Sequence, residues 1–206
     1  MKPTNKFMKR LSLYLFLLLF SFQTSSWADD IRDFQIEGMS LYSSLLDYFT
    51  GEKIKDKLKD ESTYYYKNNK YAIIGFDKIS SDQIYERIVV TIKPKDNKYI
   101  IYEIRGEIDF NNIDDCLDKQ KIIANEVSQL FKNLKFIDRE VKHGVDKTGK
   151  SIVYAKELEF ENKDEIRIGC LDWSDEMTKK NNWKDGMMVL LASDELLTWV
   201  TEEAYK

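Results

Sequence analysis

The sequence contains a single histidine and two cysteines among 206 residues. With His143 as the one imidazole, a histidine-rich zinc site is excluded, and a Ser-His-Asp triad would depend on that residue alone. The ligand spacing of an EF-hand calcium loop is also missing. We therefore assign no catalytic residue, no metal ligand and no cofactor, and we interpret His143 as a surface loop residue.

A long apolar run that could span a membrane is lacking as well. The apolar stretch over residues 11–22 is shorter than the roughly 20 residues needed to cross ~30 Å of hydrocarbon. The small-residue exit Ser26-Trp27-Ala28 follows it, and four basic residues precede it: Lys2, Lys6, Lys9 and Arg10. This pattern predicts a signal peptide over residues 1–28, cleaved after Ala28, and a periplasmic mature chain without a membrane span. No cysteine stands near the cleavage point to accept a lipid.

Positive charge is scarce once the signal peptide is removed. Its loss takes away four basic residues and no acidic one, so Lys plus Arg falls from 32 to 28 against 36 Asp plus Glu, a net charge of −8. Such a balance argues against nucleic acid or anionic lipid as the main partner. Residues 29–206 have the length of one domain with a packed core.

Cys116 and Cys170 are the one pair available, and they are too far apart in sequence for the Cys-x-x-Cys arrangement of catalytic dithiols. Export places them where disulfides persist. Closing the loop between them removes on the order of 4 kcal/mol of unfolded-chain entropy in the chain-entropy model. We expect a structural disulfide, with a redox pair and two buried free thiols as alternatives.

Hydrophobic periodicity predicts an α+β fold. Helical spacing indicates a helix over residues 40–49, with Ser40 as its N-cap, and a weaker one after a break at Thr50-Gly51, which together would form a helical hairpin. Period-two alternation then predicts three strands, on Ala72, Ile74 and Phe76, on Ile88, Val90 and Ile92, and on Ile100, Tyr102, Ile104 and Ile108. The polar turn over residues 95–98 should join the last two as a hairpin.

A long helix is predicted next, with an apolar stripe over residues 113–134 that should pack across an antiparallel sheet. Asn112 is placed to cap it, and its end charges complement the helix dipole: Asp114, Asp115, Lys132 and Lys135. Strands are then expected over 152–160, 166–171 and 187–192, and a C-terminal helix after Ser193. Strand, strand, strand, helix thus occurs twice, over residues 71–134 and 152–205, which suggests two halves of one domain.

Residues 144–151, Gly-Val-Asp-Lys-Thr-Gly-Lys-Ser, match the letters of a phosphate-binding P-loop. A P-loop needs a helix N-terminus after it, whereas Ile152 and the β-branched and aromatic residues behind it predict a strand. We therefore interpret this stretch as a connecting loop.

Acidic residues form two clusters in the sequence. The first comprises Asp109, Asp114, Asp115 and Asp118, and the second comprises Asp172, Asp175 and Glu176. We interpret both clusters as solvated faces or helix N-terminal charges.

Aromatic residues supply the best candidate for a contact surface. Trp173 and Trp183 flank a polar loop, and large amphipathic rings of this kind favour ligand or protein contacts when they are exposed. We assign Trp199 to the core.

Several segments of the mature chain resemble a family of small exported proteins from marine alphaproteobacteria, whose function is unknown. They are residues 29–40, 45–49, 98–102, 112–116, 146–151, 170–174 and 203–205. That family commonly has Ile-Gly-Asp where this chain has Leu41-Tyr42-Ser43. A shorter likeness, Gly38-Met39-Ser40 ahead of two helices and three strands, is to outer-membrane assembly lipoproteins of the BamE type, although the lipid-bearing cysteine is missing. The resemblance implies a Gram-negative envelope setting and no activity.

The sequence thus favours a non-enzymatic binding or assembly module of the bacterial envelope, with an envelope protein as a candidate partner. A hydrolase acting on envelope glycan or peptide is the alternative, and it requires a cleft lined by paired carboxylates. A structural or stress-related protein without a fixed ligand is a third class.

Overall fold

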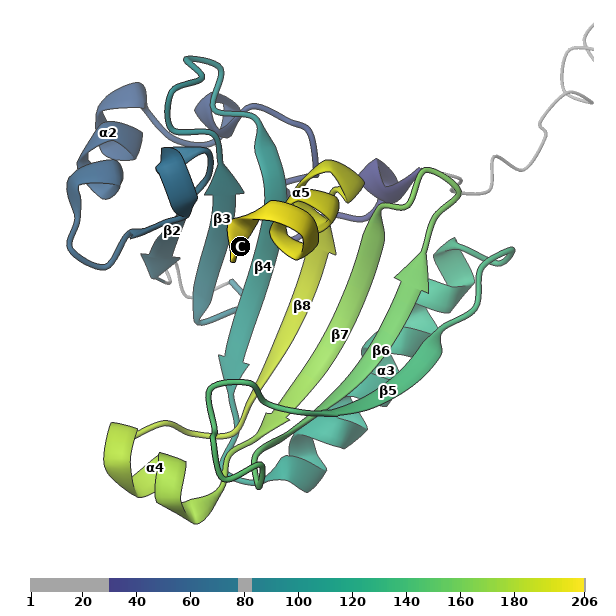
Figure 1. Cartoon of the computed structure of the whole chain (residues 1–206). Coiled ribbons are helices and arrows are strands. Elements are labelled where there is room, and N and C mark those ends of the chain that lie inside the picture. The colour runs from purple at the N-terminus through teal and green to yellow at the C-terminus, as the bar shows by residue number, and fades with distance from the viewer. Residues whose placement is uncertain (1–29, 78–82, 206) are drawn as a thin grey trace, which may run out of the picture.

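The computed structural model describes residues 30–77 and 83–205, and the predicted signal peptide lies outside them. An eight-stranded antiparallel sheet in the order β1-β2-β3-β4-β8-β7-β6-β5 dominates the fold, with helices packed on both faces (Figure 1). The strands are β1 Tyr64–Tyr65, β2 Ala72–Asp77, β3 Arg87–Ile92, β4 Ile101–Asp109, β5 Ile137–Lys142, β6 Ile152–Glu159, β7 Glu165–Asp172 and β8 Gly186–Ala192. The α-helices are α2 Gly51–Lys59, α3 Ile113–Leu130, α4 Asp175–Asn181 and α5 Asp194–Trp199. The predicted α+β class is confirmed.

The sheet joins two four-stranded meanders, β1 to β4 and β5 to β8, at an antiparallel contact between β4 and β8. Each meander is followed by a helix, and each helix packs on the other meander, α3 on β7 and β8 and α5 on β4. The two helices lie on opposite faces of the sheet (Figure 1). A two-fold axis perpendicular to the sheet at the β4–β8 contact would superpose the strands of the two meanders, but it would place both helices on the same face. The two halves are therefore not related by such a rotation.

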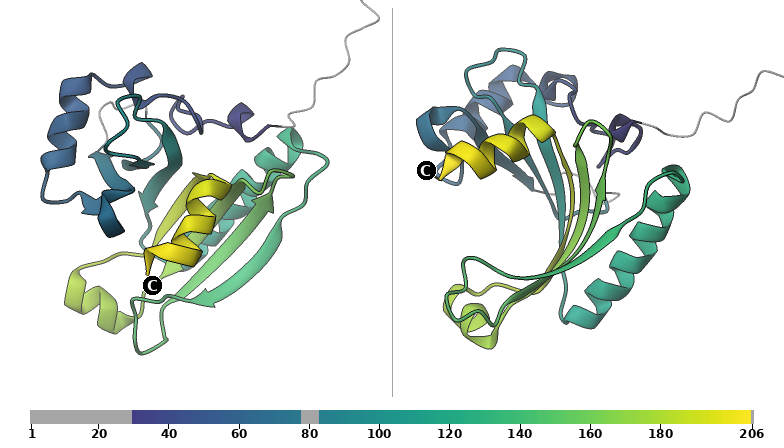
Figure 2. Two further views of the ribbon diagram at one scale, coloured as in Figure 1. Left: turned by 45° about the horizontal axis from the view of Figure 1, so that its top comes forward. Right: turned by 45° about the vertical axis from the view of Figure 1, so that its right-hand side comes forward.

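The sheet is curved, with α3 on its convex side and with α4 and α5 at the two ends of its concave side (Figure 2). The main core lies under α3 and the N-terminal segment, where buried apolar side chains from all layers meet. A smaller aromatic core lies under α5 and is built from Tyr71, Leu196 and Trp199. The assignment of Trp199 to the core is therefore confirmed.

The predicted helix over residues 40–49 is wrong. That segment holds one short 3-10 turn, η2 Leu45–Asp47. Its backbone pairs with the start of β4 and the chain just ahead of it instead, because the N–H groups of Tyr42 and Leu45 donate to the carbonyls of Ile101 and Tyr99. Thr50 begins α2 as its N-cap and is no helix breaker. The helical hairpin, and with it the helix pair expected from the BamE-type likeness, is therefore not formed.

The long helix α3 begins as predicted, since the Asn112 side chain accepts a hydrogen bond from the backbone N–H of Asp115. It ends earlier than predicted, at Leu130, because Phe131 leaves helical geometry and buries its ring edge-on against Phe160. The predicted placement of Lys132 and Lys135 in the last turn is therefore wrong.

A β-bulge in β4 changes the predicted alternation. The register between β3 and β4 shifts so that Tyr102 is an extra residue after Ile101. Ile101 and Ile104 therefore both enter the main core, whereas Tyr102 turns to the opposite face and meets Tyr71 edge-on. The hairpin between β3 and β4 is confirmed.

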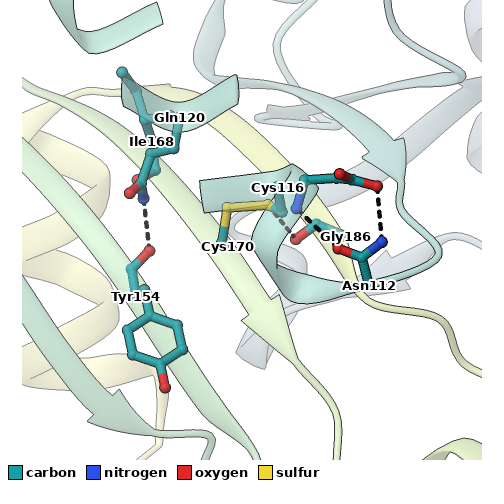
Figure 3. Close-up of a disulfide and its surroundings, with 8 residues drawn as sticks. Asn112, Cys116, Gln120, Tyr154, Ile168, Cys170 and Gly186 are labelled. Atoms are coloured by element: carbon teal, nitrogen blue, oxygen red, sulfur yellow. Dashed lines mark hydrogen bonds between the residues drawn. A yellow bond between two sulfur atoms is a disulfide. The ribbon is translucent and has the colours of Figure 1, made fainter. Parts of the chain in front are cut away.

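The disulfide predicted between Cys116 and Cys170 is present and ties the first turn of α3 to β7, with 5.9 Å between the two Cα atoms (Figure 3). One turn further along α3, the buried side-chain amide of Gln120 donates to the backbone carbonyls of Tyr154 and Ile168, at 2.7 Å each. The covalent bond and the two hydrogen bonds together fix α3 across β6 and β7.

Candidate functional site

A cavity of about 540 Å³ opens on the concave side, where the start of β3 and the end of β4 meet the chain that leads into β8. Its volume is within the range of roughly 300–1,000 Å³ found for small-molecule sites. Side chains from four segments line it, among them Arg87, Arg105, Glu107, Trp173, Trp183 and Met188. Both tryptophans that the sequence singled out therefore border one cavity.

The two tryptophans belong to a cluster of three aromatic rings packed at tilted angles. The ring centroids of Trp173 and Trp183 are 4.6 Å apart with 46° between the ring planes, and the imidazole of His143 packs at 4.4 Å from Trp173. Trp183 retains 37% of its surface exposed. Trp173 is thus held between His143 and Trp183, and Trp183 is the more exposed of the two tryptophans.

The segment between the tryptophans forms the short helix α4, where the sequence predicted a loop. Ser174 caps α4, because its hydroxyl accepts from the N–H of Met177. Asn182 then adopts a left-handed conformation, with φ of 55°, which asparagine tolerates better than most residues. This reversal brings Trp183 back against Trp173, whose backbone N–H donates to the carboxylate of Asp185 at 2.9 Å.

The P-loop-like stretch forms the turn between β5 and β6, and its donors are taken up by its own Asp146. The backbone N–H and hydroxyl of Thr148 donate to one carboxylate oxygen, and those of Ser151 donate to the other. These hydrogen bonds, with that of the Ser151 hydroxyl foremost, hold the pKa of Asp146 well below its usual range. The carboxylate thus occupies donors of the kind that would bind a phosphate in a P-loop, and strand β6 follows at Ile152 where a P-loop has a helix.

Asp146 also connects the turn to the aromatic cluster. The Ser174 hydroxyl donates to Asp146 at 3.0 Å, so the cap of α4 and the β5–β6 turn share one carboxylate. His143 lies at the start of the same turn, and burial lowers its pKa. The N–H of Val145 donates to its Nδ1 at 3.3 Å. His143 therefore supports Trp173 as a neutral ring.

Charged side chains form two ion-paired ladders on the concave face. In the first, on β3 and β4, Arg105 pairs with Glu103 and Glu107 of its own strand, and Arg87 reaches Glu107 at 2.8 Å. We call these four residues the β3–β4 ladder. Their side chains are 14–51% exposed, from Glu103 as the most covered to Arg87 as the most exposed.

The second ladder lies on β5, β6 and β7. Arg167 pairs with Glu165 of its own strand at 2.8 Å and with Glu157 of β6 at 3.1 Å, and Arg139 reaches Glu157 from β5 at 3.2 Å. We call these four residues the β5–β7 ladder.

Strand β8 separates the two ladders with apolar side chains. Leu190 stands between Arg105 and Arg167 in the sheet register, and Met188 is the next concave-side residue of β8. Gly169 has no side chain and so leaves room for Met188, since a Cβ on residue 169 would lie 3.1 Å from the Met188 Cε. The concave face thus combines an apolar strip with a row of charge pairs on each side.

Burial acts most strongly on the ladder carboxylates near α5. Desolvation raises the pKa of Glu103, although Arg105 and Arg167 both act to lower it. Desolvation likewise raises the pKa of Glu165, against the effect of Arg167. Both glutamates therefore carry an energetic cost when they are ionised.

The two acidic clusters of the sequence are not brought together. Asp114 and Asp115 lie in the first turn of α3, and Asp175 and Glu176 lie in the first turn of α4, as expected for helix N-terminal charges. Asp109 alone of these residues lines the cavity, where its carboxylate is 3.9 Å from the Lys184 ammonium group. Within residues 30–77 and 83–205, no group of three or more His, Cys, Asp or Glu side chains is placed to hold a metal ion.

Sequence reasoning missed the ladders. Their signal is an alternation of charge at period two, Glu-x-Arg-x-Glu over residues 103–107 and Glu-x-Arg over residues 165–167. On a strand this spacing places all the charges on one face. The charged side chains of the ladders pair with one another along this face.

Comparison of the chain with protein-family models, curated proteins and solved structures finds no match. No helix in the described part of the chain has the length and apolar character needed to cross a membrane.

Proposed function

We propose that this chain is an exported, non-enzymatic binding module of the bacterial envelope, and that its ligand contacts the Trp183 end of the concave face. One observation carries the proposal: a partly exposed tryptophan, backed by Trp173, borders a cavity of ligand size. Large rings held in place by neighbours bind at low conformational cost. The region is therefore suited to contact a ligand.

Export is supported by the signal-like pattern of residues 1–28 and by the disulfide, a bond that persists mainly in oxidising compartments. The proposed Gram-negative envelope setting rests in addition on the resemblance to small exported proteins of marine alphaproteobacteria. An envelope protein or an envelope polymer are both compatible with this setting.

Binding is favoured over hydrolysis by the state of the cavity carboxylates. Glycoside hydrolysis uses one protonated and one ionised carboxyl group across the substrate. Glu107 instead has an arginine Nε against each of its oxygens, from Arg105 and Arg87. Asp109 faces Lys184. Both groups are therefore arranged as ion-pair partners and lack the environment of a general acid.

Co-sedimentation with a washed envelope fraction of a Gram-negative bacterium tests the proposal. We expect the protein lacking residues 1–28 to pellet with the envelope, and the Trp183→Ala variant to remain in the supernatant. Ile122→Ala is the matched control, because Ile122 is an exposed apolar residue on α3, on the convex side. Equal pelleting of the wild type and Trp183→Ala, or no pelleting of either, would contradict the proposal.

A further inference from the structure

We infer that the ligand of the concave face is a neutral oligosaccharide, stacked on Trp183 and hydrogen-bonded by the paired charges of the β3–β4 ladder. This inference rests on the proposed binding function and adds the chemical class of the ligand. It is carried by three features of the described residues: the charge balance of the face, the geometry of its polar groups and the support behind Trp183.

The first feature is the charge balance. The two ladders contain four arginines and four glutamates, all of them in ion pairs. At the mouth of the cavity, Lys184 and Asp109 add one more pair. The face is dense in charge and close to neutral overall. An anionic ligand would have to displace the carboxylates from their arginines, and a cationic ligand would have to do the reverse, whereas a neutral polar ligand can bind without breaking the pairs.

The second feature is the geometry of the polar groups. A guanidinium group presents parallel N–H donors in a plane, and a carboxylate presents two acceptor oxygens. Two neighbouring hydroxyl groups on a sugar ring can accept from the paired N–H groups of a guanidinium and can donate to the two oxygens of a carboxylate, since each hydroxyl both donates and accepts. Arg87 is half exposed and makes its pair with Glu107 through Nε. The cavity therefore offers donors and acceptors side by side, as a polyhydroxylated ligand requires.

The third feature is the aromatic support. The C–H face of a sugar ring packs on the face of an aromatic ring, and the gain is largest when the ring is already held in place. Trp183 rests on Trp173, which rests on His143, and both contacts are shorter than 5 Å between centroids. The partly buried Met188 of β8, which lines the cavity, extends the apolar contact surface beside Trp183. Alternating apolar and polar contacts of this kind suit a chain of sugar rings.

A peptide ligand is less well matched by the face. Extended peptides commonly bind by adding a strand to a sheet edge, where main-chain groups are open. The cavity lies over the inner strands β3, β4 and β8, whose backbones are paired on both sides. The cavity therefore presents side chains, because the main-chain groups of these strands are already paired and are not available to an added peptide strand.

Titration with defined oligosaccharides, followed by tryptophan fluorescence, tests the inference. The probes are chitotetraose, cellotetraose and maltotetraose as neutral chains, a galacturonic acid tetramer as an anionic chain, and tetraalanine as a peptide. We expect saturable binding of at least one neutral tetrasaccharide, with a Kd that stays within a factor of two between low and high NaCl concentration. Binding of an anion would weaken with salt.

The variants separate the two contact types. Trp183→Ala and Arg87→Gln should each weaken the binding of that tetrasaccharide at least tenfold, whereas Ile122→Ala should leave it unchanged. Circular dichroism and thermal unfolding establish that each variant is folded. Trp173 and Trp199 remain as fluorescence reporters in the Trp183→Ala variant.

Three results would overturn the inference: no binding of any neutral tetrasaccharide at millimolar concentration, binding that survives Trp183→Ala, or binding of the anionic or peptide probe alone. The proposed function can fail separately. If the protein pellets with envelopes through Trp183 and yet binds no neutral tetrasaccharide, the assignment of the ligand is wrong and the binding function stands.

Discussion

At the scale of single residues, Asp146 organises the end of the sheet that carries the aromatic cluster. It accepts hydrogen bonds from Thr148, Ser151 and Ser174, and so joins the β5–β6 turn to the cap of α4. The folded-state pKa of Asp146 lies below that of the unfolded chain, which is ~3.9. Its contribution to stability is therefore complete above about pH 4 and is lost as the pH falls through the lower folded-state value.

We predict that Asp146→Asn unfolds at a lower urea concentration than the wild type at pH 7, and that the difference narrows at pH 3. Asp118→Asn is the control, because Asp118 is an exposed acid in an i,i+3 pair with Lys121. Its effect should remain within about 0.5 kcal/mol. A difference between Asp146→Asn and the wild type that is the same at both pH values would contradict the role given to the carboxylate.

Glu103 has the opposite titration behaviour. Burial raises its folded-state pKa above the unfolded value, so its contribution to stability is greatest below the unfolded pKa and is lost as the pH rises through the folded value. We predict that Glu103→Gln gains stability relative to the wild type as the pH increases from 4 to 8. Thermal unfolding across this range measures the gain. Parallel pH profiles of the two proteins would show that Glu103 is not held at a raised pKa.

At the scale of secondary-structure elements, close packing in the sheet depends on Gly106 of β4. A Cβ on this residue would lie 2.4 Å from the Tyr85 ring, which is itself buried in the core. We predict that Gly106→Ala destabilises the fold by about 1–3 kcal/mol through overpacking. Gly75→Ala in β2 is the matched control, because its nearest neighbour would be the Arg87 Cδ at 3.8 Å. Urea denaturation measures both variants, and equal midpoints would contradict the packing argument.

The elements also explain which parts of the fold the sequence could predict. Strand β2 was predictable because buried Ile74 alternates with less buried neighbours, and β3 because it is a run of β-branched residues that is buried from Ile88 to Ile92. Strand β5 was missed because it is an edge strand with all six residues exposed, so it carries no buried alternation. The apolar residues of the segment 40–49 fit helical spacing, yet the segment follows the hydrogen bonds of Tyr42 and Leu45 to Ile101, at the start of β4, and to Tyr99 just ahead of it. Such long-range pairing leaves no local signal.

The same limit applies to the candidate site. Trp173 and Trp183 could be selected from the sequence because they are rare, large and separated by a polar segment. Their contact depends on the left-handed Asn182 and on α4, and a single sequence gives little indication of either. The partners of Arg105 could not be predicted across strands without the order of β3, β4 and β8.

At the scale of the whole molecule, the disulfide joins the two meanders through the helix that crosses between them. Cys116 belongs to α3, which follows the first meander, and Cys170 belongs to β7 of the second, 54 residues later. The bond therefore restricts the unfolded chain over a long loop, and α3 is additionally held by the Gln120 hydrogen bonds. Both contacts act on the convex side of the sheet, on the face opposite to α5.

We predict that the Cys116→Ala, Cys170→Ala double variant still folds and loses about 2–5 kcal/mol of unfolding free energy, measured by urea denaturation against the oxidised wild type. The fold should survive because Gln120 and the buried apolar face of α3 continue to hold the helix on β6 and β7. Reduction of the wild type is the matched control, because it breaks the same bond without substituting any residue. Wild-type protein purified from the periplasm should begin at Asp29 and should not react with a thiol-alkylating reagent. A loss of unfolding free energy below about 0.5 kcal/mol in the double variant, or a free thiol in the periplasmic protein, would show that the disulfide does not stabilise this fold.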